Sequence, residues 1–117
     1  MTGNIKIKKI NKDIASILID EQKTYNALSF KNLRDLLKAL KKLDLDKRIK
    51  VIILEGAGKG FSAGHNLKEV RGLKKRSNYL KLFNLCSKVM TQIVDGKKPV
   101  IAKVHGAAFA AGCQLVA

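Results

Sequence analysis

Residues 51–66 read VIILEGAGKGFSAGHN, and this stretch decides the fold. The unbroken apolar run 51–54 predicts a strand covered on both faces, because a half-exposed strand alternates apolar with polar residues. The glycine-rich segment 56–60 then ends the strand. The sequence therefore predicts a buried strand that leads into a loop of small residues, 61–66.

A second strand is followed by a similar loop. Pro99 opens the apolar run 100–104, after which come Gly106 and the small residues 107–112. If the two loops lie side by side, their backbone N–H groups can converge on one oxygen, and a helix beginning near Ala111 adds the positive end of its dipole. Such an arrangement is an oxyanion hole. Close packing of a helix on a strand requires the same small residues, so both interpretations stay open.

The residues before this stretch predict a hairpin and a helix. Segments 5–10 and 14–20 read as strands joined by a tight turn at 11–13. Ser29 is a good helix N-cap, and apolar residues then recur at three- and four-residue spacing up to about Leu43.

Two further helices are predicted before the second loop. The first is short and covers 67–73, and Ser77 could cap a longer one that ends at Asp95 and Gly96. Segment 112–117 reads as the start of another apolar helix, so we expect the chain to be truncated there. Alternating strands and helices indicate an α/β fold. The expected apolar positions of the longer helix are Leu80, Phe83, Leu85, Cys86, Val89, Met90 and Ile93.

The composition suits one globular domain. The chain has 117 residues, 46% of them hydrophobic and 28% charged. No apolar stretch approaches the roughly 20 residues of a membrane span, so no membrane association is expected. Polar residues interrupt segment 1–12, which therefore does not resemble a signal peptide, and we expect a cytoplasmic location.

Several familiar motifs fail. Gly60 follows Lys59 where a phosphate-binding loop needs Ser or Thr. His65 and His105 have no metal-ligand spacing, so no metal site is predicted. The two cysteines, Cys86 and Cys113, are interpreted as buried free thiols.

Four ordered motifs carry a resemblance to a known family. Residues 26–28 (NAL), 61–69 (FSAGHNLKE), 98–106 (KPVIAKVHG) and 110–117 (AAGCQLVA) resemble the enoyl-CoA hydratase/isomerase (crotonase) family. Segment 86–90 (CSKVM) is also similar to the family's enoyl-CoA hydratase domain-containing protein 3 subgroup. The resemblance implies a crotonase-like spiral of strand-strand-helix turns. Residues 1–117 would be the N-terminal part of one such domain, incomplete at the C-terminus.

The resemblance also implies an acyl-CoA site. The backbone N–H groups of His65 and Ala111 match the family's two donors to the thioester oxygen, which would stabilise an enolate. The CoA-facing residues would be Ala63, His65, Asn66, Leu67 and Lys68. The implied substrate is a coenzyme A thioester of fatty acid metabolism, with no prosthetic group. The implied assembly is a homotrimer or hexamer, or a complex with a complementary C-terminal half.

Three positions depart from the family pattern. Gln114 stands where many hydratases have Glu, and a Gln side chain can orient water but cannot accept a proton. Asn66 replaces the common Asp, and Ala111 the common Gly. Glu69 is expected to face solvent, so no general base can be named within this chain, and its own hydratase (lyase) or isomerase activity is in question.

Two alternative functions remain. The formal charge of +15 suggests RNA binding, as in an AU-rich-RNA-binding member of the same family, although lysine-rich stretches are more often solvated faces. The other alternative is a non-functional or split-gene fragment, suggested by an apolar end at 115–117. The basic residues behind the RNA hypothesis are Lys68, Arg71, Lys74, Lys75 and Arg76.

Overall fold

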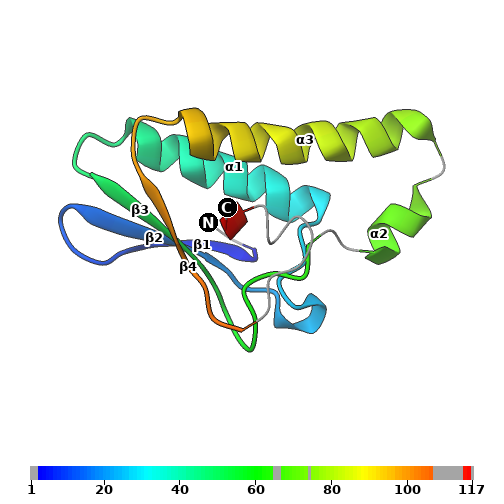
Figure 1. Ribbon diagram of the computed structural model, residues 1–117, viewed down its shortest axis with the longest axis horizontal. Helices are drawn as coiled ribbons and strands as arrows, with labels where there is room; N and C mark the ends of the chain where they lie inside the picture. The colour runs from blue at the N-terminus through cyan, green and yellow to red at the C-terminus, as the bar shows by residue number, and fades with distance from the viewer. Residues whose placement is uncertain (1–2, 65–66, 74, 107–114, 117) are drawn as a thin grey trace.

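The computed structural model describes residues 3–64, 67–73, 75–106 and 115–116. Figure 1 shows two long helices lying together over one side of a twisted sheet. The elements are β1 (Ile5–Lys9), β2 (Ile14–Ile19), the 3-10 turn η1 (Gln22–Thr24), α1 (Phe30–Leu45), β3 (Val51–Gly56), α2 (Leu67–Gly72), α3 (Arg76–Asp95) and β4 (Val100–Lys103).

The sheet has the order β1-β2-β3-β4. β1 and β2 form the predicted antiparallel hairpin, with Ile7 opposite Ile17. β2 runs parallel to β3, and β3 runs parallel to β4. The carboxyl ends of β2, β3 and β4 therefore lie at the same edge of the sheet, and each is followed by a connection that begins there.

Helix α1 begins where the sequence predicts. The Oγ atom of Ser29 accepts a hydrogen bond from the backbone N–H of Asn32 at 3.1 Å, which satisfies one of the unpaired donors of the first turn. The helix runs to Leu45, slightly beyond the expected end. Its apolar stripe is buried against the sheet and α3, and comprises Leu33, Leu36, Ala39, Leu40 and Leu43.

The prediction that β3 is covered on both faces is wrong for the described residues. Burial alternates along the strand, with Ile52 and Leu54 buried and Val51 and Ile53 only half-buried. The reason is visible in Figure 1, where both long helices lie on the same side of the sheet. An unbroken apolar run by itself does not specify what covers its second face.

Helix α3 differs from its prediction at its start and in its buried face. It begins at Arg76 with Lys75 as N-cap residue, so Ser77 already lies inside the helix and does not cap it. Leu80 and Phe83 are 50% and 47% exposed. Packing on α1 buries Cys86 and Val89, as predicted, together with Leu82, which was not among the predicted positions. The helix ends as predicted, with Gly96 donating to the Gln92 carbonyl.

The remaining predictions have mixed outcomes. Helix α2 is confirmed and ends at Gly72. Leu115 is 4% exposed and lies in the hydrophobic core cluster, so the expected exposure of the apolar end is wrong at this residue, whereas Val116 is 39% exposed. Cys86 is a buried free thiol as expected, and burial raises its pKa, whereas Cys113 lies outside the described residues. No helix within the described ranges is long and apolar enough to cross a membrane.

Replacing Leu36 with Ala tests the core of α1. Leu36 is fully buried, so Leu36→Ala should lower the free energy of unfolding by about 2 to 5 kcal/mol through lost burial and the remaining cavity. Leu45→Ala is the matched control, because Leu45 lies on the same helix and is 77% exposed. Urea unfolding measures both, and equal effects of the two substitutions would show that the helix packs differently.

Candidate functional site

The bases of the two predicted loops meet at the carboxyl edge of the sheet. The Nε2 atom of His105, after β4, lies 2.5 Å from the Gly58 carbonyl oxygen, after β3. Gly106 has φ +66, and a Cβ atom built on it would lie 2.1 Å from the Lys59 carbonyl oxygen. Only glycine permits both this backbone conformation and this approach. The loops predicted to converge are therefore in contact where they leave their strands.

Asn26 holds the first loop from the inside. Its side chain is 1% exposed, and its Nδ2 atom donates to the Ala57 carbonyl at 2.7 Å. The same Nδ2 lies within hydrogen-bond distance of the carbonyls of Gly60 (3.1 Å) and Phe61 (3.2 Å). Its Oδ1 atom accepts from the Glu21 N–H at 2.8 Å. One buried carboxamide thus joins the connection after β2 to the loop after β3.

Ser62 has a structural role. Its hydroxyl donates to the Asn26 carbonyl at 2.8 Å and accepts from the Gly64 N–H at 3.2 Å, and the residue is 1% exposed. Both hydrogen bonds hold the hydroxyl in the protein interior, so Ser62 is not placed to act as a nucleophile. The neighbouring backbone bonds join Ala63 N–H to the Tyr25 carbonyl at 2.9 Å and Leu28 N–H to the Gly64 carbonyl at 2.6 Å.

The end of β3 also requires a glycine. A Cβ atom on Gly56 would lie 2.3 Å from the Phe61 carbonyl oxygen and 3.0 Å from Nδ2 of Asn26. The chain therefore turns back on itself closely enough for Phe61, which is fully buried, to fill the space beneath the loop. Gly56 thus permits a close approach between two backbone segments of the same loop.

The prediction that Glu69 faces solvent is wrong. Its Oε1 atom accepts a hydrogen bond from the Phe30 N–H at 2.9 Å, and the residue is half-buried. A carboxylate at the first turn of α1 satisfies an unpaired donor and complements the helix dipole. The chain on both sides of segment 65–68 is therefore anchored, at Gly64 to Leu28 and at Glu69 to Phe30.

The predicted site residues are only partly described. Ala63 is half-buried in the anchored loop, and Leu67 and Lys68 begin helix α2. His65, Asn66, Ala111 and Gln114 lie outside the described residues. The oxyanion hole and the CoA contacts assigned to these residues therefore stay predictions.

A small cavity that the sequence did not reveal lies beside the anchored loop. Its volume is about 330 Å³, and Lys23 and Lys59 give it two cationic side chains. In the sequence, the only indication of this cavity is that Lys23 lies close to the Asn26 motif and that Lys59 lies within the glycine segment. The lining residues are Gln22, Lys23, Tyr25, Ala57, Lys59 and Gly60.

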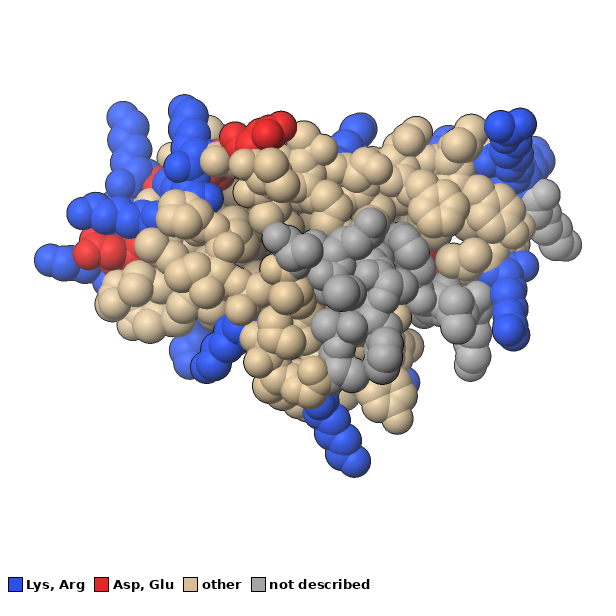
Figure 2. All heavy atoms as spheres, viewed as in Figure 1, with Lys and Arg blue, Asp and Glu red and all other residues tan. Residues whose placement is uncertain are grey.

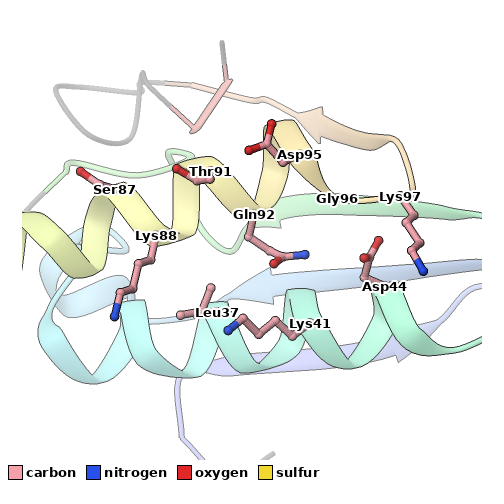
Figure 3. A pocket seen from close by; sticks show the side chains of 10 residues that line it. All are labelled: Leu37, Lys41, Asp44, Ser87, Lys88, Thr91, Gln92, Asp95, Gly96 and Lys97. Atoms are coloured by element: carbon pink, nitrogen blue, oxygen red, sulfur yellow. The ribbon is translucent and has the colours of Figure 1, made fainter.

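Two other features lie away from this edge. A hollow of about 590 Å³ between α1 and α3, drawn in Figure 3, is lined by side chains that include Lys41, Asp44 and Lys88.

Arg71 and Arg76 of the proposed RNA-binding stretch are exposed, as a solvated face and a nucleic-acid surface both require. Among the residues that the structure describes, no three His, Cys, Asp or Glu residues cluster as metal ligands.

Asn26→Asp tests the anchoring of the loop. A carboxylate cannot donate to the carbonyls that Nδ2 serves, and it would place a buried charge against them, so we expect a loss of at least about 2 kcal/mol in the free energy of unfolding. Asn84→Asp, at an exposed position of α3, is the isosteric control. Urea unfolding compares the two, and a variant as stable as the control would contradict the assigned role.

Comparison with known proteins identifies the family. A family model described as enoyl-CoA hydratase/isomerase matches residues 9–117. The mitochondrial enoyl-CoA hydratase domain-containing protein 3 of Xenopus laevis is 40% identical over 104 residues, which cover 89% of this chain and 35% of the relative. Its human counterpart is 42% identical, with 89% and 34% covered. The chain thus spans about a third of the length of these curated relatives.

Solved structures agree in fold. An enoyl-CoA hydratase from Mycobacterium smegmatis superposes with a TM-score of 0.92 at 38% identity, covering 97% of this chain and 44% of that one. Human enoyl-CoA hydratase domain-containing protein 3 gives a TM-score of 0.91 at 36% identity with the same coverage. The described sheet and helices thus form part of the crotonase fold, and the chain belongs to the enoyl-CoA hydratase/isomerase family.

Proposed function

We propose that this chain binds an acyl-CoA thioester and holds the thioester oxygen between the backbone N–H groups of His65 and Ala111. The observation that carries the proposal is the contact between the two loop bases, where Gly106 lies against the Lys59 carbonyl. Family membership supports the choice of ligand. The two donors follow these loop bases in the sequence, one along each chain segment.

The rigidity of the first loop favours this chemistry. Donors that stabilise a developing enolate act best when they are already in place, and each is typically worth about 3 kcal/mol of transition-state stabilisation. The chain before His65 is held by Asn26 and Ser62, and the chain after it by Glu69. These bonds would preorganise the His65 N–H with no catalytic side chain in the loop.

The surrounding charge suits a coenzyme A ligand. Lys23 and Lys59 line the cavity beside the loop, and both can attract the phosphates of the cofactor portion. The resemblance adds Lys68 as a phosphate neighbour and the Ala63 carbonyl as an acceptor for the adenine amino group. Anion attraction and the oxyanion donors would then act on opposite ends of one ligand.

Proton transfer is the step for which this chain has no identified base. Gln114 occupies the position of a family glutamate and cannot serve as a base. Glu69, the acid nearest the loop in sequence, is committed to the Phe30 N–H. We therefore assign this chain thioester binding and enolate stabilisation, and we expect proton transfer to require a carboxylate other than Glu69.

Binding of acetoacetyl-CoA tests the proposed site. Its enolate absorbs in the near ultraviolet, so an oxyanion hole should strengthen that band and give tighter binding than free CoA. Gly106→Ala should abolish the difference, because the new Cβ collides with the Lys59 carbonyl. Gly72→Ala is the control, since a Cβ there meets nothing within 4 Å. Equal binding of both ligands by the unmodified protein would refute the proposal.

The Gln114→Glu substitution tests the missing carboxylate. Restoring a proton acceptor should raise the hydration rate of an α,β-unsaturated acyl-CoA by at least about 100-fold in the protein that contains this chain. Loss of the enoyl absorbance measures the rate. Gln92→Glu, on α3, introduces the same charge change away from the loops and should leave the rate unchanged. Indistinguishable rates for the two variants would remove Gln114 from the mechanism.

A further inference from the structure

The opposite edge of the sheet carries a second basic site. β2 and β3 begin side by side, with Ile14 paired to Val51, so the connections that precede them lie together. One connection is the β1–β2 turn at 10–13, and the other is the α1–β3 connection at 46–50. In Figure 1 both lie at the left end of the molecule, away from the candidate acyl-CoA loops.

These two connections, with Lys9 at the end of β1, line an open hollow of about 430 Å³. Five of its six lining side chains are cationic, and the sixth is the carboxylate of Asp13. In Figure 2 basic side chains project from the same end of the molecule. The full lining is Lys9, Lys12, Asp13, Lys47, Arg48 and Lys50.

The backbone of the hollow is well fixed. The Asn11 Oδ1 atom accepts from the N–H groups of Asp13 and Ile14 at 2.8 and 2.9 Å, which closes the turn. The Lys50 N–H donates to the Asp13 carbonyl at 2.6 Å and ties the two connections together. Ile49, at 1% exposure, anchors the second connection in the core. The lysines thus extend from a rigid frame.

Arg48 is already neutralised within this frame. Its guanidinium donates to both carboxylate oxygens of Asp46, at 3.2 and 3.1 Å. The backbone N–H of Arg48 also donates to Oδ1 of Asp46. The side-chain and backbone bonds from Arg48, with smaller help from Lys9, lower the pKa of Asp46 to about 2. Among the residues described, Lys9, Lys12, Lys47 and Lys50 form no salt bridge. The four lysine ammonium groups around the hollow therefore share it with a single carboxylate, that of Asp13.

We propose that this hollow binds the phosphate chain of a multiply charged phosphate anion. Lysine ammonium groups bind phosphate as strong point charges, and several are needed to offset three or more negative charges. The hollow is open to solvent, so the attraction would come from the lysine charges and not from enclosure of the ligand. The six-residue strands β2 and β3 separate this site by about 20 Å from the candidate acyl-CoA loops, so one small ligand would not occupy both.

Titration with tripolyphosphate tests the proposal. Backbone amide NMR shifts should change at 11–13 and 47–50, whether or not the anion also shifts amides near Lys59, and the concentration dependence of the shifts at 11–13 and 47–50 gives the Kd of this site. Lys12→Glu combined with Lys47→Glu should weaken binding by at least about tenfold, because both reversed charges face the anion at short range. Lys31→Glu combined with Lys38→Glu, at exposed positions of α1, makes the same change in net charge and should alter the Kd by less than about twofold.

The remaining outcomes also decide the question. Equal weakening by both double variants would show diffuse attraction by the net charge of +15 and overturn the site. Absence of saturable shifts at 11–13 and 47–50, with any shifts confined to 57–64, would overturn it as well. Adenosine triphosphate is titrated in parallel. A lower Kd than for tripolyphosphate, with shifts at the same amides, supports the site and identifies a nucleotide as the source of the phosphate chain.

Discussion

The buried carboxamide of Asn26 is the interaction on which the candidate site depends. It faces the carbonyls of three residues that are 31 to 35 positions away in sequence, at a place where the turning backbone gives those oxygens no strand partner. An unpaired buried carbonyl costs free energy comparable to a lost hydrogen bond, so this side chain allows the loop to turn inside the protein. Asn26 itself has φ +56, a conformation that Asn tolerates better than most residues. Asn26 thus adopts the left-handed backbone conformation that this position requires, and its side chain also donates to the carbonyls of the loop.

The parallel strands and two glycines bring the bases of the two loops into contact. Because β3 and β4 are parallel and adjacent, the segments that follow them leave the same edge. Gly56 and Gly106 then allow contacts with Phe61 and Lys59 that are closer than a Cβ atom would permit. Glu69 adds a second constraint by joining the helix after the loop to the start of α1. The loop that carries the predicted His65 donor is consequently held on both sides by buried or half-buried polar contacts.

The same sheet separates two regions of positive charge. Lys23 and Lys59 lie beside the carboxyl edge, where we propose that a coenzyme A thioester binds. Lys12 and Lys47 lie beside the amino edge, in connections fixed by short-range turn bonds. Part of the charge that is spread along the sequence is therefore gathered at the two ends of the strands, while other lysines and arginines lie on α1 and α3. An overall charge of +15 does not itself distinguish two local sites from a solvated surface.

Local pattern alone predicted the element order, the hairpin and the Ser29 cap, because each depends on neighbours within a few residues. The resemblance of four motifs added the family, which the comparisons confirm. Local pattern did not reveal that the second face of β3 is only half-buried, or that α3 buries Leu82 and leaves Leu80 and Phe83 exposed, since these depend on which element packs against them. It also placed Glu69 in solvent and assigned no role to the Asn26 side chain. Only the tertiary structure decided those two roles, because their hydrogen bonds join residues more than 30 positions apart.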